Sequence, residues 1–215
     1  METSAGQWEI VQAGVAELIA PGRYRLTRLL RGQRGTESPV AGMVSSGARV
    51  VVLDTTVASL PISEANLGLP WNWRIGPASK PASDETFVAA SFIPEGVGLR
   101  PFSVAHVEQP WRIARSPGDL TIRWTRRSRS LAADTWGAGD VPLAEDSEAY
   151  EVEIRDGSTV KRTLTTTTTS ALYTAAQQTA DWGSPLGPGQ SLAIRIFQLS
   201  AMIGRGAGRS VRLTF

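Results

Sequence analysis

The sequence contains no cysteine and only one histidine, His106, in 215 residues. The lack of cysteine excludes disulfide bonds and thiolate nucleophiles, and it removes the ligands of most zinc sites. One histidine leaves little for acid–base catalysis, because catalytic and metal sites need several converging groups. We therefore expect His106 to be structural or exposed, and the fold to be stabilised by packing.

The sequence also lacks a long apolar run and a strong charge imbalance. No run approaches the roughly 18 apolar residues of a membrane helix, and residues 1–4 have neither the basic nor the apolar part of a secretory signal. The 22 basic and 20 acidic side chains give a formal net charge of +2. This small excess gives little support to nucleic-acid binding, and we expect neither that partner nor a membrane span.

What the sequence does contain is short runs of β-branched and aromatic residues alternating with polar ones. Twenty-one glycines and 13 prolines interrupt these runs, which indicates an all-β fold. The clearest extended segments are residues 7–11, 23–30, 49–53, 86–92, 120–126, 150–155, 192–199 and 211–215. Helical patterns are weak, and only residues 63–67 and 175–180 are expected to form a turn or two.

Prolines at positions 101, 110 and 117 interrupt the pattern and predict a domain boundary near residue 105. We expect a β-rich module over residues 1–104 and a second β domain over residues 105–215. In the second domain, Leu120, Ile122 and Trp124 fall on one strand face. Tyr150, Val152 and Ile154 alternate with charged residues in the same way, before a turn at Asp156-Gly157. The expected strands are residues 104–113, 119–127, 149–155, 159–164, 171–174, 191–199 and 209–215, the pattern of a seven-stranded sandwich.

The second domain resembles a fibronectin type III domain in three places: Trp124, the Tyr150-Glu151-Val152 motif and the glycine-rich segment 204–210. The resemblance implies a fibronectin type III-like β-sandwich. It departs from the family at Leu192, which stands where a tyrosine normally makes the corner hydrogen bond.

The chain as a whole resembles the C-terminal region of the large tail-tip protein of gene transfer agents and related siphophages. The blocks that carry this resemblance are residues 8–12, 17–26, 29–37, 98–107 and 124–129. The resemblance implies a structural baseplate hub protein, sometimes called a host-specificity protein, that is a trimer in the particle and contacts other tail-tip proteins. It places the protein in the virion after synthesis in the host bacterial cytoplasm. Family members carry a hydrolase-related region upstream that this sequence lacks, and Met1 favours a separately encoded segment over a fragment.

No motif predicts an enzyme, a metal site or a cofactor site. Five acidic residues are candidates for a glycosidase pair, but acidic residues near turns usually cap or face solvent. These residues are Asp54, Asp84, Glu85, Glu145 and Asp146. The glycine-rich segment 204–208 joins two strands, and so it predicts a hairpin rather than a phosphate loop.

Two groups of arginines are potential contact surfaces. Arg123, Arg127 and Arg129 fall on one strand face, which either binds phosphate or acidic glycans or forms a solvated or inter-subunit face; we favour the second interpretation. A second group occupies the first module, and we expect it to pair at a packed interface. Its members are Arg23, Arg25, Arg28, Arg31 and Arg34.

Seven tryptophans are many for this length, and such rings often contact sugars or proteins. We expect Trp8 and Trp124 in the core, and Trp71 and Trp73 as anchors of a loop. Trp136, Thr167 and Arg205 lie in three loops that meet at one end of a sandwich, so they are the candidate contact residues for a host surface glycan or receptor. The alternative is that these side chains only fill their loops.

The leading hypothesis is a non-enzymatic structural component of a tail tip. An adhesion module that binds a receptor or glycan is the first alternative, and a tail-associated glycan hydrolase is the second.

Overall fold

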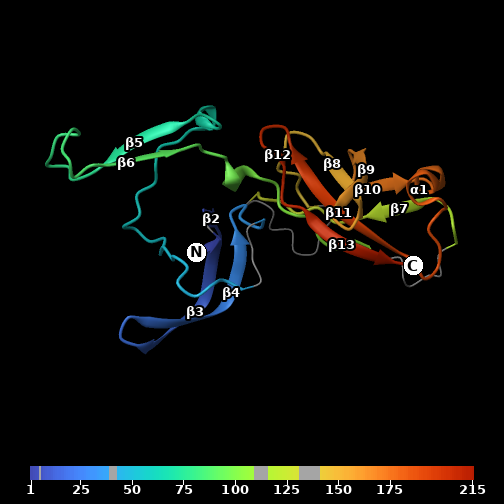
Figure 1. Ribbon diagram of the computed structural model, residues 1–215, viewed down its shortest axis with the longest axis horizontal. Coiled ribbons are helices and arrows are strands. Elements are labelled where there is room, and N and C mark those ends of the chain that lie inside the picture. Colours follow the sequence, from blue (N-terminus) through green and yellow to red (C-terminus); the bar gives the residue numbers. More distant parts are fainter. Residues whose placement is uncertain (5, 39–42, 109–115, 131–140) are drawn as a thin grey trace. The chain divides into compact units, whose positions relative to one another are not determined.

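A computed structural model of the chain describes residues 1–4, 6–38, 43–108, 116–130 and 141–215 (Figure 1). Strands predominate and helices are few, so the all-β fold expected from the sequence is confirmed. Contacts divide the chain into two compact units. Unit 1 combines Met1–Arg49 with Gly98–Phe215, and unit 2 is Val50–Val97.

The C-terminal part of unit 1 is a β-sandwich of two sheets. One sheet is five-stranded, with β12 and β13 both paired to β11, then β8, then β9; the other pairs β7 with β10. Every pairing between these strands is antiparallel. The strand bounds are β7 Leu120–Arg123, β8 Tyr150–Asp156, β9 Thr159–Thr166, β10 Ser170–Tyr173, β11 Ser191–Ser200, β12 Gly204–Arg205 and β13 Arg209–Thr214. An isolated bridge joins Ala105 to Thr125 beyond the end of β7.

One apolar core lies between the two sheets, because alternate residues of each strand point inward. Trp124 and Tyr150 meet edge to face, with ring centroids 5.2 Å apart. Both rings are buried, and each large apolar side chain removed from water contributes about 1.5–3 kcal/mol. The core residues supplied by the strands include Leu120, Ile122, Val152, Ile154, Leu164, Tyr173, Leu192, Ile194, Ile196 and Leu213. The predicted alternation in segments 120–126 and 150–155 is therefore confirmed.

A short helix, α1 (Ala175–Trp182), connects the two sheets between β10 and β11. Thr174 caps its first turn by accepting a hydrogen bond from the Gln177 backbone, while the Gln177 side chain accepts from the Thr174 backbone. Gly183 ends the helix in the left-handed conformation at φ 86°. The helix predicted over residues 175–180 is confirmed, and the short helix predicted at 63–67 is a 3₁₀ turn, Glu64–Asn66.

The N-terminal part of unit 1 is dominated by a long two-stranded ribbon of β3 (Ile10–Ala20) and β4 (Arg23–Gln33). It follows a small sheet of β1 (Glu2–Ser4) and β2 (Gln7–Trp8). Gly22, at φ 68°, forms part of the tight connection between β3 and β4. Arg28 has φ 55° and sits opposite Gly14, where an added Cβ would lie 3.0 Å from the Arg28 Cβ. A larger residue at position 14 would therefore press on Arg28, and glycine avoids this close approach.

Unit 2 contains one hairpin, β5 (Trp71–Ile75) paired with β6 (Val88–Phe92), and very little core. Within Val50–Val97, all of which the structure describes, Pro94 is the single buried residue. Trp71 and Trp73 lie in β5, so the expectation that they anchor a loop is wrong. The strand predicted at residues 49–53 is also wrong, because this segment has high strand propensity but pairs with no strand in the described part of the chain.

The division into units does not coincide with the domain boundary expected near residue 105. Ser103 donates its backbone N–H to the carboxylate of Glu37 at 2.7 Å, and Arg127 forms an ion pair with the same carboxylate. These contacts tie the N-terminal segment to the sandwich within unit 1. A short 3₁₀ helix, Val97–Leu99, lies where the chain passes from unit 2 back to unit 1. No helix in the described residues is long and apolar enough to cross a membrane.

Candidate functional site

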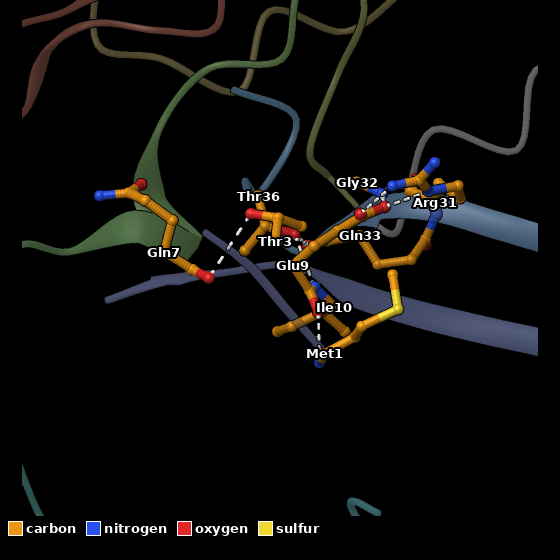
Figure 2. A network of polar contacts seen from close by, with 9 residues as sticks. All are labelled: Met1, Thr3, Gln7, Glu9, Ile10, Arg31, Gly32, Gln33 and Thr36. Carbon is orange, nitrogen blue, oxygen red and sulfur yellow. Dashed lines mark hydrogen bonds and ion pairs between the residues drawn. The ribbon is translucent and has the colours of Figure 1, made fainter. Parts of the chain in front are cut away.

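The base of the β3–β4 ribbon is organised around Glu9, whose side chain is fully buried (Figure 2). Arg31 donates from Nε to one carboxylate oxygen of Glu9 at 2.9 Å and pairs with the other oxygen through a terminal nitrogen. The backbone N–H of Gly32 donates to the first oxygen, also at 2.9 Å. The Glu9 backbone N–H donates to the carbonyl oxygen of Met1 at 2.8 Å. A buried carboxylate of this kind is stable only because its oxygens are satisfied.

Burial by itself raises the pKa of the Glu9 carboxyl, but the hydrogen bonds from Arg31 and Gly32 outweigh it and hold the pKa below its ordinary value. The group is therefore ionised at neutral pH. General acids in glycosidases show the opposite shift, towards a raised pKa. Glu9 thus serves as an anchor for the ribbon and is unsuited to donate a proton.

A second set of hydrogen bonds continues the network on the other side of Glu9 (Figure 2). Ile10 donates its backbone N–H to the hydroxyl of Thr36 at 2.9 Å, and that hydroxyl donates to the carbonyl oxygen of Gln33 at 2.6 Å. The chain bends sharply here, with positive φ at Gly32, Arg34 and Gly35. The ribbon is therefore held at its base by both side-chain and backbone bonds.

The ribbon beyond this base presents an exposed apolar face. Leu18 pairs with Tyr24, Ala16 with Leu26 and Gln12 with Leu30. Cross-strand partners and alternate residues share a face, so Leu18, Tyr24 and Leu26 lie on one side of the ribbon. Val15 and Leu29, both 43% exposed, lie on the other side. Tyr24 and Leu18 are about 60% exposed, at 61% and 59%. A two-stranded ribbon by itself buries little apolar surface, and this face leaves large side chains exposed.

The arginines of this module were expected to pair at a packed interface, and the structure separates them. Arg31 binds Glu9, and Arg25 forms an exposed pair with Glu17 at 3.5 Å. Arg23, Arg28 and Arg34 have no ionic partner among the residues that the structure describes. Their interface pairing remains a prediction.

The predicted contact residues Trp136, Thr167 and Arg205 have different outcomes. Trp136 lies outside the described residues. Thr167 is exposed in the bend after β9, where the neighbouring Thr168 donates its backbone N–H to the hydroxyl of Thr166 at 3.2 Å. The pairings of Tyr150 with Thr166 and with Gln198 place this bend at the same end of the sheet as β12. Thr167 and Arg205 are therefore at one end of the sandwich, with two strands between them.

The guanidinium of Arg205 is already bound by acidic side chains of its own sheet. Its guanidinium donates to Glu151 at 2.6 Å and to Glu153 at 2.7 Å, and it lies 4.6 Å from the centroid of the Phe197 ring. Arg155 also donates to Glu153, at 3.0 Å. The side chain therefore fastens the short strand β12 across the outer face of β8 and β11. A role in contacting a host surface is untested, but the alternative of a structural side chain has direct support.

The basic segment 123–129 was expected to lie on one strand, but β7 ends at Arg123 and the segment continues beyond it with only the bridge at Thr125. Its arginines are matched by acidic residues. Arg126 donates to Glu148 at 3.0 Å, and Arg129 donates to Glu145 at 2.8 Å. Arg127 pairs with Glu37 and also lies over the Phe102 ring at 5.0 Å. Arg123 pairs with Glu108 at 4.0 Å in an exposed position. These pairs leave little unmatched positive charge for phosphate or acidic glycans.

Three of the five acidic residues considered for glycosidase chemistry, Asp54, Asp84 and Glu145, hold turns or form ion pairs. Asp54 accepts hydrogen bonds from the hydroxyl and backbone of Thr56, and Asp84 does the same for Thr86. The hydroxyl bonds are the largest cause that lowers the pKa of each carboxyl. His106 is exposed, with φ 46°. Within the described residues, no group of three His, Asp or Glu side chains is placed to hold a metal ion.

Unit 2 contains a row of stacked rings beside an open hollow. Trp71 stacks on Trp73 with centroids 5.5 Å apart, and Trp73 stacks on Phe92 at 6.3 Å. The hollow has a volume of about 560 Å³ and is lined by Trp73, Phe87 and Phe92 together with Lys80. Aromatic rings in such an open site can bind a sugar or a protein side chain.

Sequence reasoning missed a buried polar cluster beside α1. Gln178 is fully buried, donates to the carbonyl oxygens of Gly118 at 2.9 Å and Tyr173 at 2.7 Å, and accepts from the Leu186 backbone at 2.9 Å. The Tyr173 hydroxyl donates to Asp181 at 2.7 Å, and Asp181 accepts two bonds from Arg162. This cluster ties α1 to both sheets, through Arg162 of β9 and Tyr173 of β10. A buried glutamine on a short helix leaves no periodic signal that would reveal it.

The N-terminal module is also the part of the chain that matches a known family. Residues 1–51 match the family model described as "Rcc01698-like, C-terminal", a family associated with phages and gene transfer agents. No curated protein matches the chain. Among solved structures, the chain is similar to domains d3–d4 of the rat CD45 extracellular region, with 10% sequence identity and a TM-score of 0.36. That alignment covers 82% of this chain and 80% of the other.

Proposed function

We propose that this protein is a non-enzymatic structural component of the tail tip or baseplate of a siphophage or gene-transfer-agent-like particle. It is made in the cytoplasm of the host bacterium and resides in the virion as a trimer, in contact with other tail-tip proteins. The trimer and the tail-tip position derive from the resemblance in the sequence.

The observation that carries this proposal is the coincidence of the family match with the ribbon. Residues 1–51 include the Glu9 network and the whole β3–β4 ribbon, whose exposed apolar face is not covered by any described residue of its unit. Large exposed apolar surfaces in proteins commonly mark contact sites for partners. A ribbon that is fixed at its base and exposes apolar side chains along its length is suited to bind a neighbouring particle protein.

The charged side chains also favour a structural role over catalysis. Glu9 is ionised and saturated with hydrogen bonds, and Asp54 and Asp84 have lowered pKa values because hydroxyl groups hold them. Hydrolysis of a glycoside needs a carboxyl group with a raised pKa next to a second carboxylate. These three acidic residues are therefore poor candidates for that chemistry.

The proposal is tested by substitution of the ribbon's apolar face in the particle-producing bacterium. Leu26→Asp places a charge on that face, and Leu172→Asp places the same charge on β10 of the sandwich, at a matched exposure of 49% against 52%. We expect Leu26→Asp to lower the amount of this chain in purified particles at least tenfold, because a charge in an apolar contact costs several kcal/mol. Leu172→Asp is expected to be incorporated like the native chain.

Cryo-electron microscopy of native particles supplies the location. Three copies around the tip agree with the proposal. Absence of the chain from purified particles, or equal incorporation of both variants, contradicts it.

A receptor- or glycan-binding adhesion module is the second candidate, and the stacked rings of unit 2 favour it. This function predicts measurable binding of the purified chain to host envelope polysaccharide. Trp73→Ala would then weaken binding at least tenfold, while Leu69→Ala, an exposed residue of the same unit outside the hollow, would not. Absence of binding by the native chain eliminates this candidate.

A further inference from the structure

Residues 50–53, Val-Val-Val-Leu, form an apolar segment without a partner. Their exposed fractions are 63%, 52%, 72% and 65%. None of their backbone groups makes a hydrogen bond within the described part of the chain. Three successive valines and a leucine have high strand propensity, so the segment combines the side chains and the free backbone groups of an unpaired strand.

Both ends of this segment are fixed. Arg49 makes two hydrogen bonds to Glu2, at 2.9 and 2.7 Å, and its carbonyl oxygen accepts from the Glu2 backbone at 2.9 Å. Asp54 follows the segment and holds a turn through its bonds to Thr56. The four-residue segment between these two anchors is therefore short, uncharged and exposed to solvent.

The chain also has an open strand edge that fits such a segment. In the described residues β3 pairs with β4 alone, which leaves its other edge free. Proteins usually protect a free edge with charged side chains. β4 carries Arg23, Arg25, Arg28 and Arg31, whereas residues 10–16 of β3 carry no charge. Four residues span about 13 Å as a strand, which is shorter than this uncharged stretch.

We propose that residues 50–53 of one copy add as an extra strand to the open edge of β3 in a second copy. The same chain presents both the strand and the edge, so a second copy suffices as partner, and the contact is of the head-to-tail type, which forms a ring where the rotation between copies closes. Valine side chains beside Ala16 and Leu18 would extend the apolar face of the ribbon. The inference goes beyond the proposed function, since it concerns contact between copies and holds for any oligomer of this chain.

Cysteine cross-linking tests this contact in the full chain, because the native sequence has no cysteine to interfere. Val51→Cys and Val15→Cys are made in separate chains, mixed and oxidised. We expect disulfide-linked pairs that contain one chain of each variant, because opposed strand residues lie within disulfide range. The matched control mixes Val51→Cys with Leu172→Cys, an equally exposed apolar position on β10, and is expected to yield few pairs.

Each other result overturns the proposal. Val51→Cys chains that cross-link to each other as readily show that the segment pairs with itself. A double variant, Val51→Cys with Val15→Cys, that forms a bond within one chain shows intramolecular pairing. Equal yields in the control mixture show random collision.

Sedimentation measured without cross-linking gives a second readout. The native chain is expected to associate with increasing concentration, and Val51→Lys to weaken association at least tenfold, which corresponds to about 1.4 kcal/mol. Val57→Lys, outside the segment, is the control. A native chain that stays monomeric up to its solubility limit overturns the proposal.

Discussion

Glu9 and Arg31 are 22 residues apart in sequence and form a two-point ion pair at the base of the β3–β4 ribbon, with the carboxylate buried and the guanidinium about a quarter exposed. The pair joins the residue before β3 to the end of β4. It therefore sets where the ribbon begins, and loss of one partner leaves a charge without its counterpart.

Glu9→Gln tests the importance of this pair. We expect the substitution to lower the free energy of unfolding of unit 1 by about 2 kcal/mol, because bonds to a charged acceptor are lost in a buried place. Glu17→Gln breaks an exposed pair at 3.5 Å and is expected to cost less than about 0.5 kcal/mol. Urea unfolding measures both. Equal effects of the two variants would show that the burial of Glu9 has no consequence.

The lowered pKa of Glu9 predicts a pH dependence. A carboxyl whose pKa is lower in the folded state stabilises the fold above its ordinary value of 4.5, and this contribution is lost as pH falls through the folded-state pKa. The difference in unfolding free energy between the native chain and Glu9→Gln should thus be constant above about pH 5 and shrink below about 4.5. Unfolding curves between pH 3 and pH 7 measure it. A difference that grows on acidification would contradict the assignment.

Gln178 is expected to be among the residues of the sandwich least tolerant of substitution. Gln178→Leu removes three hydrogen bonds of a fully buried side chain and leaves the carbonyl oxygens of Gly118 and Tyr173 with one partner fewer, so we expect a loss of about 3 kcal/mol. Thr179→Ala changes an exposed neighbour on the same helix and is expected to cost about 0.5 kcal/mol or less. Thermal unfolding followed by circular dichroism distinguishes them, and similar midpoints would refute the prediction.

Arg205→Ala separates a structural role from a contact role. The pairs with Glu151 and Glu153 are partly exposed, so we expect a loss of about 1 kcal/mol and faster hydrogen exchange in β12. Arg209→Ala, an exposed arginine without an ion pair among the described residues, is expected to change neither. Lost binding to host envelope material with unchanged stability would instead favour the contact role.

The strands β7 and β8 were predicted well because each places alternate apolar residues in the core. The described part of the strand predicted at residues 104–113 forms only the bridge at Ala105. Tyr150, Val152 and Ile154 alternate with charged residues, and burial on a shared core produces that period directly. The N-terminal module was predicted less well, because its strands β3 and β4 have almost no buried residues and so no core imposes an alternating pattern on them. Trp8 was expected in the core and is 37% exposed, with Arg49 over its ring, while its neighbour Glu9 is buried. Hydrophobicity alone would predict the reverse arrangement of these two residues.

Structural features that depend on contact with one particular residue or strand elsewhere in the protein leave no periodic pattern in the sequence. Residues 49–53 have the composition of a strand, but composition does not say whether a second strand exists within the same chain. Gln178 and Asp181 look like ordinary polar residues of a short helix until their partners in β9, β10 and the preceding loop are known. The candidate contact surface was placed from loop positions alone, and this could not foresee that Arg205 binds Glu151 and Glu153.

The division of unit 1 into two separated stretches of sequence has a consequence for how the protein is made. Glu37 emerges from the ribosome 66 residues before Ser103, its backbone partner, and 90 residues before Arg127. At about 5–20 residues per second, the first stretch waits roughly 3–13 s for Ser103 alone. During that interval residues 10–33 of the ribbon and residues 50–53 have both been synthesised, while the sandwich that follows them in the chain has not.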